Sequence, residues 1–293
     1  MFCENSDIAS YADDNSPFSC EKDLNSVIEK LTADSMTLLK WVKLNGLKAN
    51  PDKFHLLLNV TDKAYSIEIQ NFKIFNSNCE KLLGISIDNT LSFDNHVAEL
   101  CRKASQKLHA LSRISHFMSI QQRKIIMKSF IHSQFGYCPL VWMFHSRKLN
   151  NRINKIHERS LRIVYDDNHL TFRELLDKDK SFTIHERNIQ TLAIELYKVV
   201  NRISPNLMYQ VFPLKSTVKY YSKNPFRTRN VRTVRYGTET LAHLGPKIWA
   251  IIPNEIKEAD SLKVFKSRIK LWNPINCPCK LCRVYICGVG FID

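Results

Sequence analysis

The chain has 293 residues, of which 44% are hydrophobic, so it is long enough to bury the core of one large domain or of two to three smaller ones. No apolar run approaches the roughly 18 residues that a membrane-spanning helix requires, and the first residues lack the basic and then apolar pattern of a signal peptide. We therefore expect an intracellular protein of the nucleus or cytoplasm, neither secreted nor bound to a membrane.

The formal charge of +15 is distributed unevenly along the chain. Residues 1–95 carry nine Lys against fourteen Asp and Glu, a net charge of −5, whereas residues 96–293 carry thirty-four basic residues against fourteen acidic ones, a net charge of +20. An acidic segment that gathers cations, followed by a basic segment that attracts phosphates, favours a nucleic-acid partner. The alternative is a solvated basic surface that binds no ligand.

The first part of the sequence predicts a small α+β arrangement. Apolar residues at helical spacing predict a helix over Leu24–Leu44, which Gly46 is placed to end. The predicted strands flank this helix: Ile8 to Ala12, a turn at Asp13 to Ser16, Phe18 to Cys20 after Pro17, then Phe54 to Val60 and Ser66 to Ile69.

From His96 onward the pattern is mostly helical, in keeping with only seven glycines in the chain. An apolar stripe from Val97 to Ile114 predicts the first helix of this part. Further helices are predicted over residues 120–134, 147–165, 172–176, 184–200, 240–251 and 262–271, with an irregular segment over 213–236.

Two adjacent carboxylates follow the first predicted strand, in the tetrapeptide Tyr11-Ala12-Asp13-Asp14. At the tip of a hairpin they can hold divalent ions that clamp the attacking and leaving oxygens of a phosphoryl transfer. Asp and Asn are also ordinary turn residues, because their side chains cap their own backbone. The tetrapeptide therefore has a catalytic and a merely structural interpretation.

The residues that follow the tetrapeptide occur in a characteristic order: Trp41, Asn45-Gly46-Leu47, Asn50, Lys53, Leu82-Leu83-Gly84-Ile85, Ile87-Asp88, Leu91, Phe93 and His96. This ordered set resembles the palm-to-thumb stretch of reverse transcriptases from non-LTR (LINE-type, jockey-like) retrotransposons. The resemblance covers residues 8–116 and continues more loosely through residues 133–142 and 227–232.

The resemblance implies an RNA-directed DNA polymerase in which Asp13 and Asp14 bind magnesium and Lys53 lies near the nucleotide phosphates. Leu82-Leu83-Gly84 matches the hairpin that grips the primer, although Leu82 stands where the family usually has an aromatic residue. The expected partners are an RNA template and a DNA primer or target DNA. The implied organisation is a partial palm (1–95), a helical thumb (96–165), a basic helical region (166–272) and a Cys-rich tail (273–293).

The family also has fingers and another metal-binding aspartate on an earlier palm strand, and neither has a counterpart in this sequence. We therefore expect a truncated polymerase that does not synthesise DNA alone. The alternative is a non-catalytic, element-derived protein that binds nucleic acid and in which the two aspartates only form a turn.

Basic residues off the apolar stripes are the candidate nucleic-acid contacts. The arginine run after residue 226 is interleaved with Phe226 and Tyr236, which suits phosphate contact and base stacking but equally suits a solvated linker. The candidates are Arg102, Lys103, Lys107, Arg152, Lys155, Arg159, Arg227, Arg229, Arg232 and Arg235.

Four of the nine cysteines lie in the last seventeen residues, at Cys277, Cys279, Cys282 and Cys287. Their C-x-C-x2-C-x4-C spacing is compatible with one tetrahedral zinc site, although a knuckle usually pairs C-x2-C with a distant second pair. Many elements of the resembling family end in a Cys-rich motif, which favours zinc. The alternative is a frayed tail with free thiols.

Overall fold

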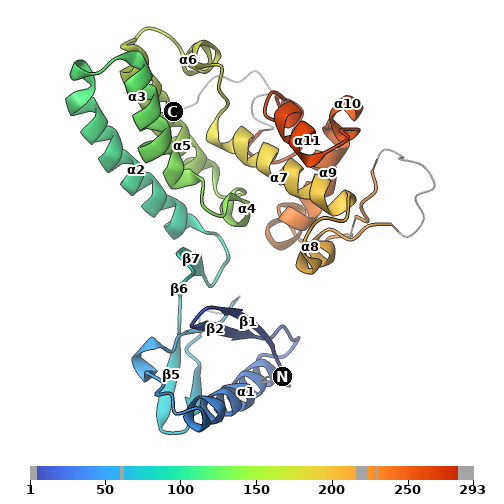
Figure 1. Ribbon diagram of the computed structural model, residues 1–293. Helices are drawn as coiled ribbons and strands as arrows, with labels where there is room; N and C mark the ends of the chain where they lie inside the picture. Colours follow the sequence, from blue (N-terminus) through green and yellow to red (C-terminus); the bar gives the residue numbers. More distant parts are fainter. Residues whose placement is uncertain (1–4, 60–62, 216–223, 229, 283–293) are drawn as a thin grey trace. The chain divides into compact units, whose positions relative to one another are not determined.

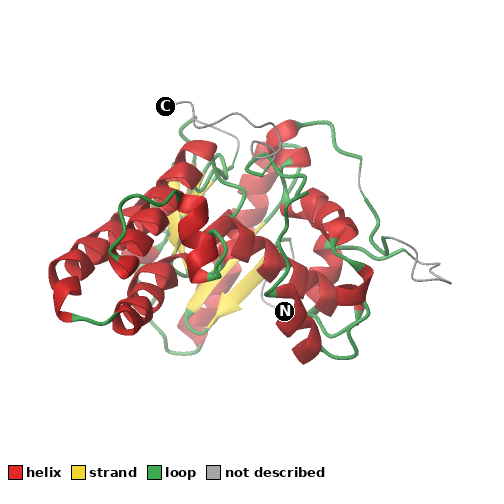
Figure 2. Ribbon diagram, turned by 90° about the horizontal axis from the view of Figure 1, so that it is seen from above, coloured by secondary structure: helices red, strands yellow, loops and turns green. Residues whose placement is uncertain are grey.

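The computed structural model describes residues 5–59, 63–215, 224–228 and 230–282. The chain divides into unit 1, up to Phe93, and unit 2, from Asp94 onward. Both contain helices, and small sheets are present in unit 1 (Figures 1 and 2), so the α+β class predicted from the sequence is confirmed. Within the described ranges no helix combines the length and apolarity needed to cross a bilayer.

Unit 1 begins with the antiparallel hairpin of β1 (Asp7–Tyr11) and β2 (Asp14–Phe18), in which Tyr11 faces Asp14. The turn therefore consists of Ala12 and Asp13 alone, and the predicted turn over Asp13 to Ser16 was wrong. Turn-forming residues after Asp13 lie in the strand instead. Proline has no amide hydrogen to donate. Pro17 fits in β2 because, in a sheet of two strands, each strand has an outer edge that pairs with no other strand.

The helix α1 (Leu24–Leu44) confirms the predicted bounds. The Asp23 side chain caps its first turn by accepting a hydrogen bond from the Ser26 amide at 3.1 Å, and Gly46 follows its end with φ of 70°. Its apolar side packs on a three-stranded sheet of order β3-β5-β4 through a small core of Leu31, Leu56, Leu58, Ile67 and Ile69.

In that sheet, β3 (Leu56–Leu57) runs parallel to β5 (Phe72–Ser77), and β4 (Ser66–Ile69) runs antiparallel to it. The strand predicted over Ser66 to Ile69 is confirmed. The strand predicted from Phe54 is much shorter than expected, because the 3-10 turn η1 (Pro51–Lys53) precedes it and only two residues pair with β5.

Unit 2 is helical and centres on α7, which contacts α4, α5, α9 and α11. In Figure 1, α2, α3 and α5 lie side by side, and α2 makes its most extensive packing with α5. The helices are α2 (Asp94–Ile114), α3 (Ile120–Ile126), α4 (Pro139–Trp142), α5 (Arg147–Tyr165), α6 (Phe172–Asp179), α7 (Ile184–Val200), α8 (Asn206–Val211), α9 (Leu241–Ile251), α10 (Asn254–Lys257) and α11 (Leu262–Ile269). The predicted helical runs are confirmed, whereas the short helices α8 and α10 were not foreseen.

Short turns fill the gaps between these helices. A π-helical turn η3 (Met127–Ile131) and a 3-10 turn η4 (His132–Phe135) extend α3 over the predicted run, while η2 (Ser115–Phe117) follows α2 and η5 (Val234–Thr238) precedes α9.

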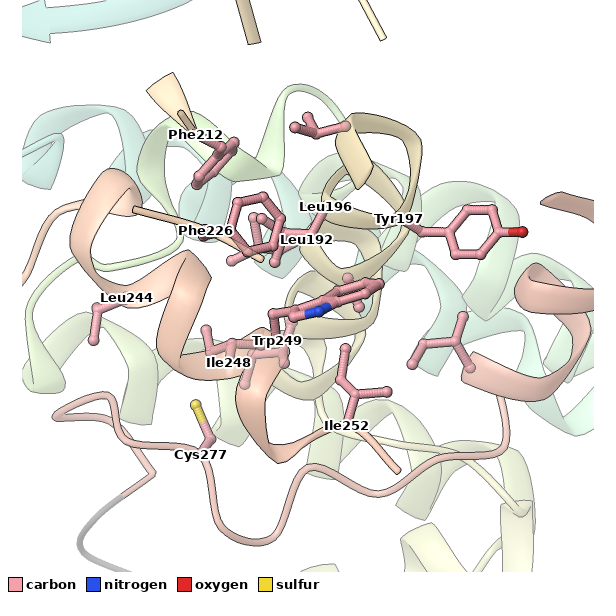
Figure 3. Close-up of a cluster of buried hydrophobic side chains, with 14 of the residues drawn as sticks. Leu192, Leu196, Tyr197, Phe212, Phe226, Leu244, Ile248, Trp249, Ile252 and Cys277 are labelled. Atoms are coloured by element: carbon pink, nitrogen blue, oxygen red, sulfur yellow. The ribbon is translucent and has the colours of Figure 1, made fainter. Parts of the chain in front are cut away.

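The main core of unit 2 is built around aromatic side chains. Trp249 of α9 lies against Leu192 and Leu196 of α7 (Figure 3), and Phe226 packs edge-on against Trp249 with ring centroids 5.9 Å apart. Phe226 is 1% exposed. It is a core residue, so the interpretation in which it stacks on a nucleic-acid base was wrong, and so was a fully solvated linker at this position.

A buried polar cluster joins α5, η4 and α7. The Arg187 guanidinium lies 3.1 Å from Nδ1 of His132 and 3.4 Å from Nε2 of His157. A guanidinium only donates hydrogen bonds, so both imidazole nitrogens act as acceptors and both rings are neutral. Burial and the neighbouring Arg187 lower the pKa of His132 to about 3, and burial also lowers the pKa of His157.

We predict that acid destabilises unit 2 through these histidines. Between an unfolded pKa of about 6.5 and the lower folded value, the unfolded chain binds more protons, so stability rises with pH and is lost as the pH falls below about 6.5. Each histidine should contribute up to about 1.4 kcal/mol per pH unit. Urea unfolding between pH 7.5 and 4.5 measures the slope.

His157→Gln should reduce the slope of stability against pH by about 1.4 kcal/mol per pH unit, which corresponds to one proton. The same change at the exposed His169 should leave the slope as in the wild type. Equal slopes in His157→Gln and wild type would contradict a neutral, buried His157.

Candidate functional site

The two aspartates of the tetrapeptide occupy the tip of the first hairpin. Asp13 lies in the two-residue turn and Asp14 is the first residue of β2, and both are exposed. Ala12 adopts φ of 54°, a left-handed conformation that costs a residue with a Cβ roughly 1–2 kcal/mol. The hairpin thus presents two adjacent carboxylates to solvent from a tight, strained turn.

The base of this hairpin is fastened to α1 through Asp34, which is 1% exposed. Its carboxylate accepts hydrogen bonds from the Asn5 amide at 3.1 Å, from the Asn5 side chain at 2.9 Å and from the Ser6 hydroxyl at 2.5 Å. These residues directly precede β1, and β2 also packs on α1. Asp34 therefore positions the hairpin without belonging to its tip.

The two carboxylates at the hairpin tip do not by themselves make a two-metal site. Among the described residues, the one group of three or more potential metal ligands is His185, Cys279 and Cys282, so no third ligand of this kind joins Asp13 and Asp14. Two-metal phosphoryl transfer bridges ions about 4 Å apart and needs carboxylates from more than one strand. The tip can contribute to such a centre but does not complete it.

Lys53 is exposed at the end of η1, and Asn50 caps that turn by accepting a hydrogen bond from the Asp52 amide at 3.2 Å. Within the described part of the chain, no ion pair holds the Lys53 ammonium. The Asn50 and Lys53 spacing thus has a structural basis, since Asn50 forms the turn that presents Lys53.

A hairpin is present at Leu82-Leu83-Gly84: it is formed by β6 (Cys79–Leu82) and β7 (Ile85–Asp88), with Leu83 and Gly84 in its turn. Both turn residues have positive φ, 46° and 86°, as a two-residue hairpin turn with the twist of its strands requires. The side chains of Leu82 and Leu83 are 39% and 42% exposed, so the tip offers apolar contact area.

Asp88 ends this hairpin and organises the loop that follows. Burial raises its pKa, but hydrogen bonds from Ser92, Thr90 and Phe93 outweigh burial and lower the pKa to about 2. The Phe93 amide donates to the carboxylate at 2.7 Å. Asp88 is therefore an ionised loop anchor at neutral pH.

A basic stripe runs along the exposed side of α5. It consists of Lys148, Arg152, Lys155 and Arg159, which are spaced by four, three and four residues and therefore share one face of the helix. At 1.5 Å per residue the stripe is about 16 Å long. None of its four side chains forms an ion pair with another described residue, whereas Arg162 on the same helix binds Glu158 at 2.7 Å.

The basic residues predicted on α2 are in a different electrostatic situation. Arg102 and Lys103 both pair with Glu99, at 2.7 Å and 3.6 Å, and Lys107 lies over the Phe130 ring. Glu99 offsets part of the positive charge of this face of α2. The basic stripe on α5 has no such acidic partner among the described residues.

In the arginine run, Arg227, Arg232 and Arg235 are exposed, and the Arg235 guanidinium lies over the Tyr236 ring at 5.7 Å. Arg229 lies outside the described residues. The aromatic partner of this run is Tyr236, which is 45% exposed, since Phe226 belongs to the core.

Three of the four predicted zinc ligands come together. The Cys277 thiol hydrogen bonds with Cys279 and Cys282, while Cys287 lies outside the described residues. A residue that the sequence interpretation did not include, His185 of α7, places Nε2 at 3.1 Å from the Cys279 sulfur.

Comparison with known proteins supports a relation to transposon polymerases. The chain is 22% identical over 207 residues to a Drosophila melanogaster protein described as a probable RNA-directed DNA polymerase from transposon BS. The match covers 68% of this chain and 22% of that protein, so the chain spans about a fifth of the length of this relative. No family model and no solved structure matches the chain. The chain is thus distantly similar to a reverse transcriptase.

The sequence interpretation missed three residues that shape these sites: Asp34, Glu99 and His185. Glu99 was detectable, since it precedes Arg102 and Lys103 by three and four residues on a predicted helix. Asp34 and His185 act on partners 29 and 94 residues away, and no local pattern marks such contacts.

Proposed function

We propose that this chain is the palm-to-thumb part of an RNA-directed DNA polymerase from a non-LTR retrotransposon, truncated relative to the active enzyme. In this proposal unit 1 is the partial palm, and Asp13 and Asp14 supply magnesium ligands to a centre whose other carboxylate and whose fingers come from an upstream polymerase segment. Unit 2 holds the RNA template and the DNA primer or target DNA.

The observation that carries the proposal is the exposed Asp13 and Asp14 pair on an anchored two-residue turn, in a chain similar to a transposon polymerase. Magnesium prefers carboxylate oxygens and keeps free positions for water and phosphate, which an exposed pair permits. Lys53, presented on η1 without an ion-pair partner among the described residues, suits a role beside the nucleotide phosphates.

The basic stripe on α5 supports the nucleic-acid role of unit 2. Four cations on one helical face over about 16 Å, without ion-pair partners in the described part of the chain, can follow the phosphates of a single strand without reading its bases. The same stripe would serve a non-catalytic nucleic-acid-binding protein, so catalysis is the property that distinguishes the two functions.

A primer-extension assay tests the proposal. The chain alone should incorporate no nucleotides on an RNA template with magnesium, because its hairpin tip lacks a third carboxylate. Joined to the upstream polymerase segment encoded by its own element, it should extend the primer in a magnesium-dependent manner.

Two results would contradict this account. Extension by the chain alone would show that its metal centre is already complete. A joined chain that is folded and binds the primer and template, yet extends nothing, would favour the non-catalytic nucleic-acid-binding function.

A further inference from the structure

Four residues with zinc-binding side chains meet where the segment after α11 passes the start of α7. Cys277, Cys279 and Cys282 belong to that segment, and His185 lies in the first turn of α7. The ligand atoms of His185, Cys279 and Cys282 all lie within 4.8 Å of one another, and Cys277 lies beside both other cysteines but outside this group. We propose that these four residues bind one structural zinc ion, with His185 in place of Cys287.

The spacing of His185, Cys279 and Cys282 suits tetrahedral coordination, whereas Cys277 lies outside this group and would move closer to the other ligand atoms when the metal binds. With zinc bonds of about 2.3 Å to sulfur and 2.0 Å to nitrogen, neighbouring sulfurs lie about 3.8 Å apart and a sulfur and a nitrogen about 3.5 Å apart. The observed 3.1 Å between His185 Nε2 and Cys279 Sγ needs only a few tenths of an ångström of adjustment. Three cysteines and one histidine form a closed set, as structural zinc sites have.

Two backbone turns bring the cysteines together. The Cys277 amide donates to the Pro274 carbonyl at 3.1 Å, and the Cys282 amide donates to the Cys279 carbonyl at 3.2 Å. These turns fold the C-x-C-x2-C stretch tightly and keep its three cysteines close together. The fourth ligand, His185, lies on the helix α7. It therefore takes the place of a cysteine from the second pair that a zinc knuckle usually has.

The thiols are buried in a way that favours a cation. Cys277 and Cys279 are 0% and 1% exposed, and Cys282 is partly buried. Thiolates brought together away from water require a compensating cation, and a divalent ion would stabilise all three.

The surrounding contacts connect this cluster to the core of unit 2. Gln190 of α7 donates to the Trp272 carbonyl at 2.9 Å, and Lys280 forms an ion pair with Glu239. Cys277 and Cys279 are themselves part of the main hydrophobic cluster, where Cys277 lies next to α9 in Figure 3. Zinc bound here would fasten the C-terminal segment to α7 and stabilise unit 2, independently of any polymerase activity.

Zinc content and coordination of the purified full chain test the proposal. We expect one equivalent of zinc per chain, and X-ray absorption at the zinc edge should show three sulfur ligands and one nitrogen. Cobalt substitution should give the strong visible bands of a tetrahedral site. Removal of the metal by a chelator should lower the melting temperature of the chain.

Matched variants separate the ligands from their neighbours. Cys279→Ser and His185→Gln should reduce bound zinc to well below half an equivalent. Cys287→Ser should keep it near one, as should Cys101→Ser, which changes a buried cysteine of α2. His145→Gln tests the neighbouring buried histidine, which interacts electrostatically with His185 and Cys279 and whose Nδ1 lies 2.9 Å from the Trp142 carbonyl; it should also keep bound zinc near one equivalent.

Wild-type absorption data do not depend on whether a variant folds, so they decide the ligand set directly. Four sulfur ligands, or loss of zinc in Cys287→Ser, would overturn the assignment of His185. Loss of zinc in His145→Gln but not in His185→Gln would also overturn it. A chain isolated without zinc and with fewer than nine free thiols would overturn the site in favour of a disulfide.

Discussion

Replacing Asp13 or Asp14 by Asn in the joined polymerase should lower the rate of RNA-templated synthesis by roughly a thousandfold or more. Each substitution removes a charged oxygen ligand from ions that neutralise the phosphates as the new bond forms. The exposure of both side chains means that the loss would not come from a disrupted core. Single-turnover primer extension measures the chemical step.

Asp7→Asn is the matched control for these variants. Asp7 is exposed on the same hairpin but pairs with Phe18 at its base, at the opposite end from the tip. Its rate should stay within about twofold of the wild type. Equal losses in all three variants would show that the hairpin tolerates no change of charge and that Asp13 and Asp14 have no special role.

Neutralising the basic stripe on α5 should have the second largest effect. Each phosphate contact on a single strand contributes a salt slope of about −0.7 on a log-log scale, which equals about fivefold in affinity at 0.1 M salt. Replacing Lys148, Arg152, Lys155 and Arg159 by Gln should therefore weaken binding several hundredfold and flatten the slope by about 3. Fluorescence anisotropy of a labelled RNA at several salt concentrations gives both quantities.

The control for the stripe is the pair Arg102→Gln and Lys103→Gln on α2. Because Glu99 already engages both side chains, their removal should change the slope by less per residue than the changes on α5. If the α2 variant lost more affinity per residue than the α5 variant, the main contact surface would lie on α2. An unchanged slope in the α5 variant would remove the stripe from the interface.

The helices were predictable because their signals are local. Asp23 caps α1 and Gly46 follows it, and the capping box of Thr183 and Glu186 starts α7. Apolar residues at helical spacing along α5, with basic residues between them, correctly predicted its buried and basic faces. These features depend on residues within one or two turns of each other, which a sequence displays directly.

The parts that were not predictable depend on tertiary packing. The hairpin turn was placed too late because Asn15 and Ser16 favour turns, yet strand pairing with β1 extends β2 through them. Phe226 looked like a stacking residue among arginines until the structure placed it in the core. His185 became a metal ligand candidate only because α7 carries it to Cys279.

The proposed function requires that Asp13 and Asp14 hold catalytic metal ions, and the number of bound manganese ions tests this requirement directly. Electron paramagnetic resonance can count Mn²⁺ on the joined chain in complex with an RNA template, a DNA primer and a non-hydrolysable nucleotide. We predict two tightly bound ions in the wild type and in Asp7→Asn, and fewer than two in Asp13→Asn and Asp14→Asn. Two ions retained in both tip variants would contradict the assignment of the hairpin as a metal site.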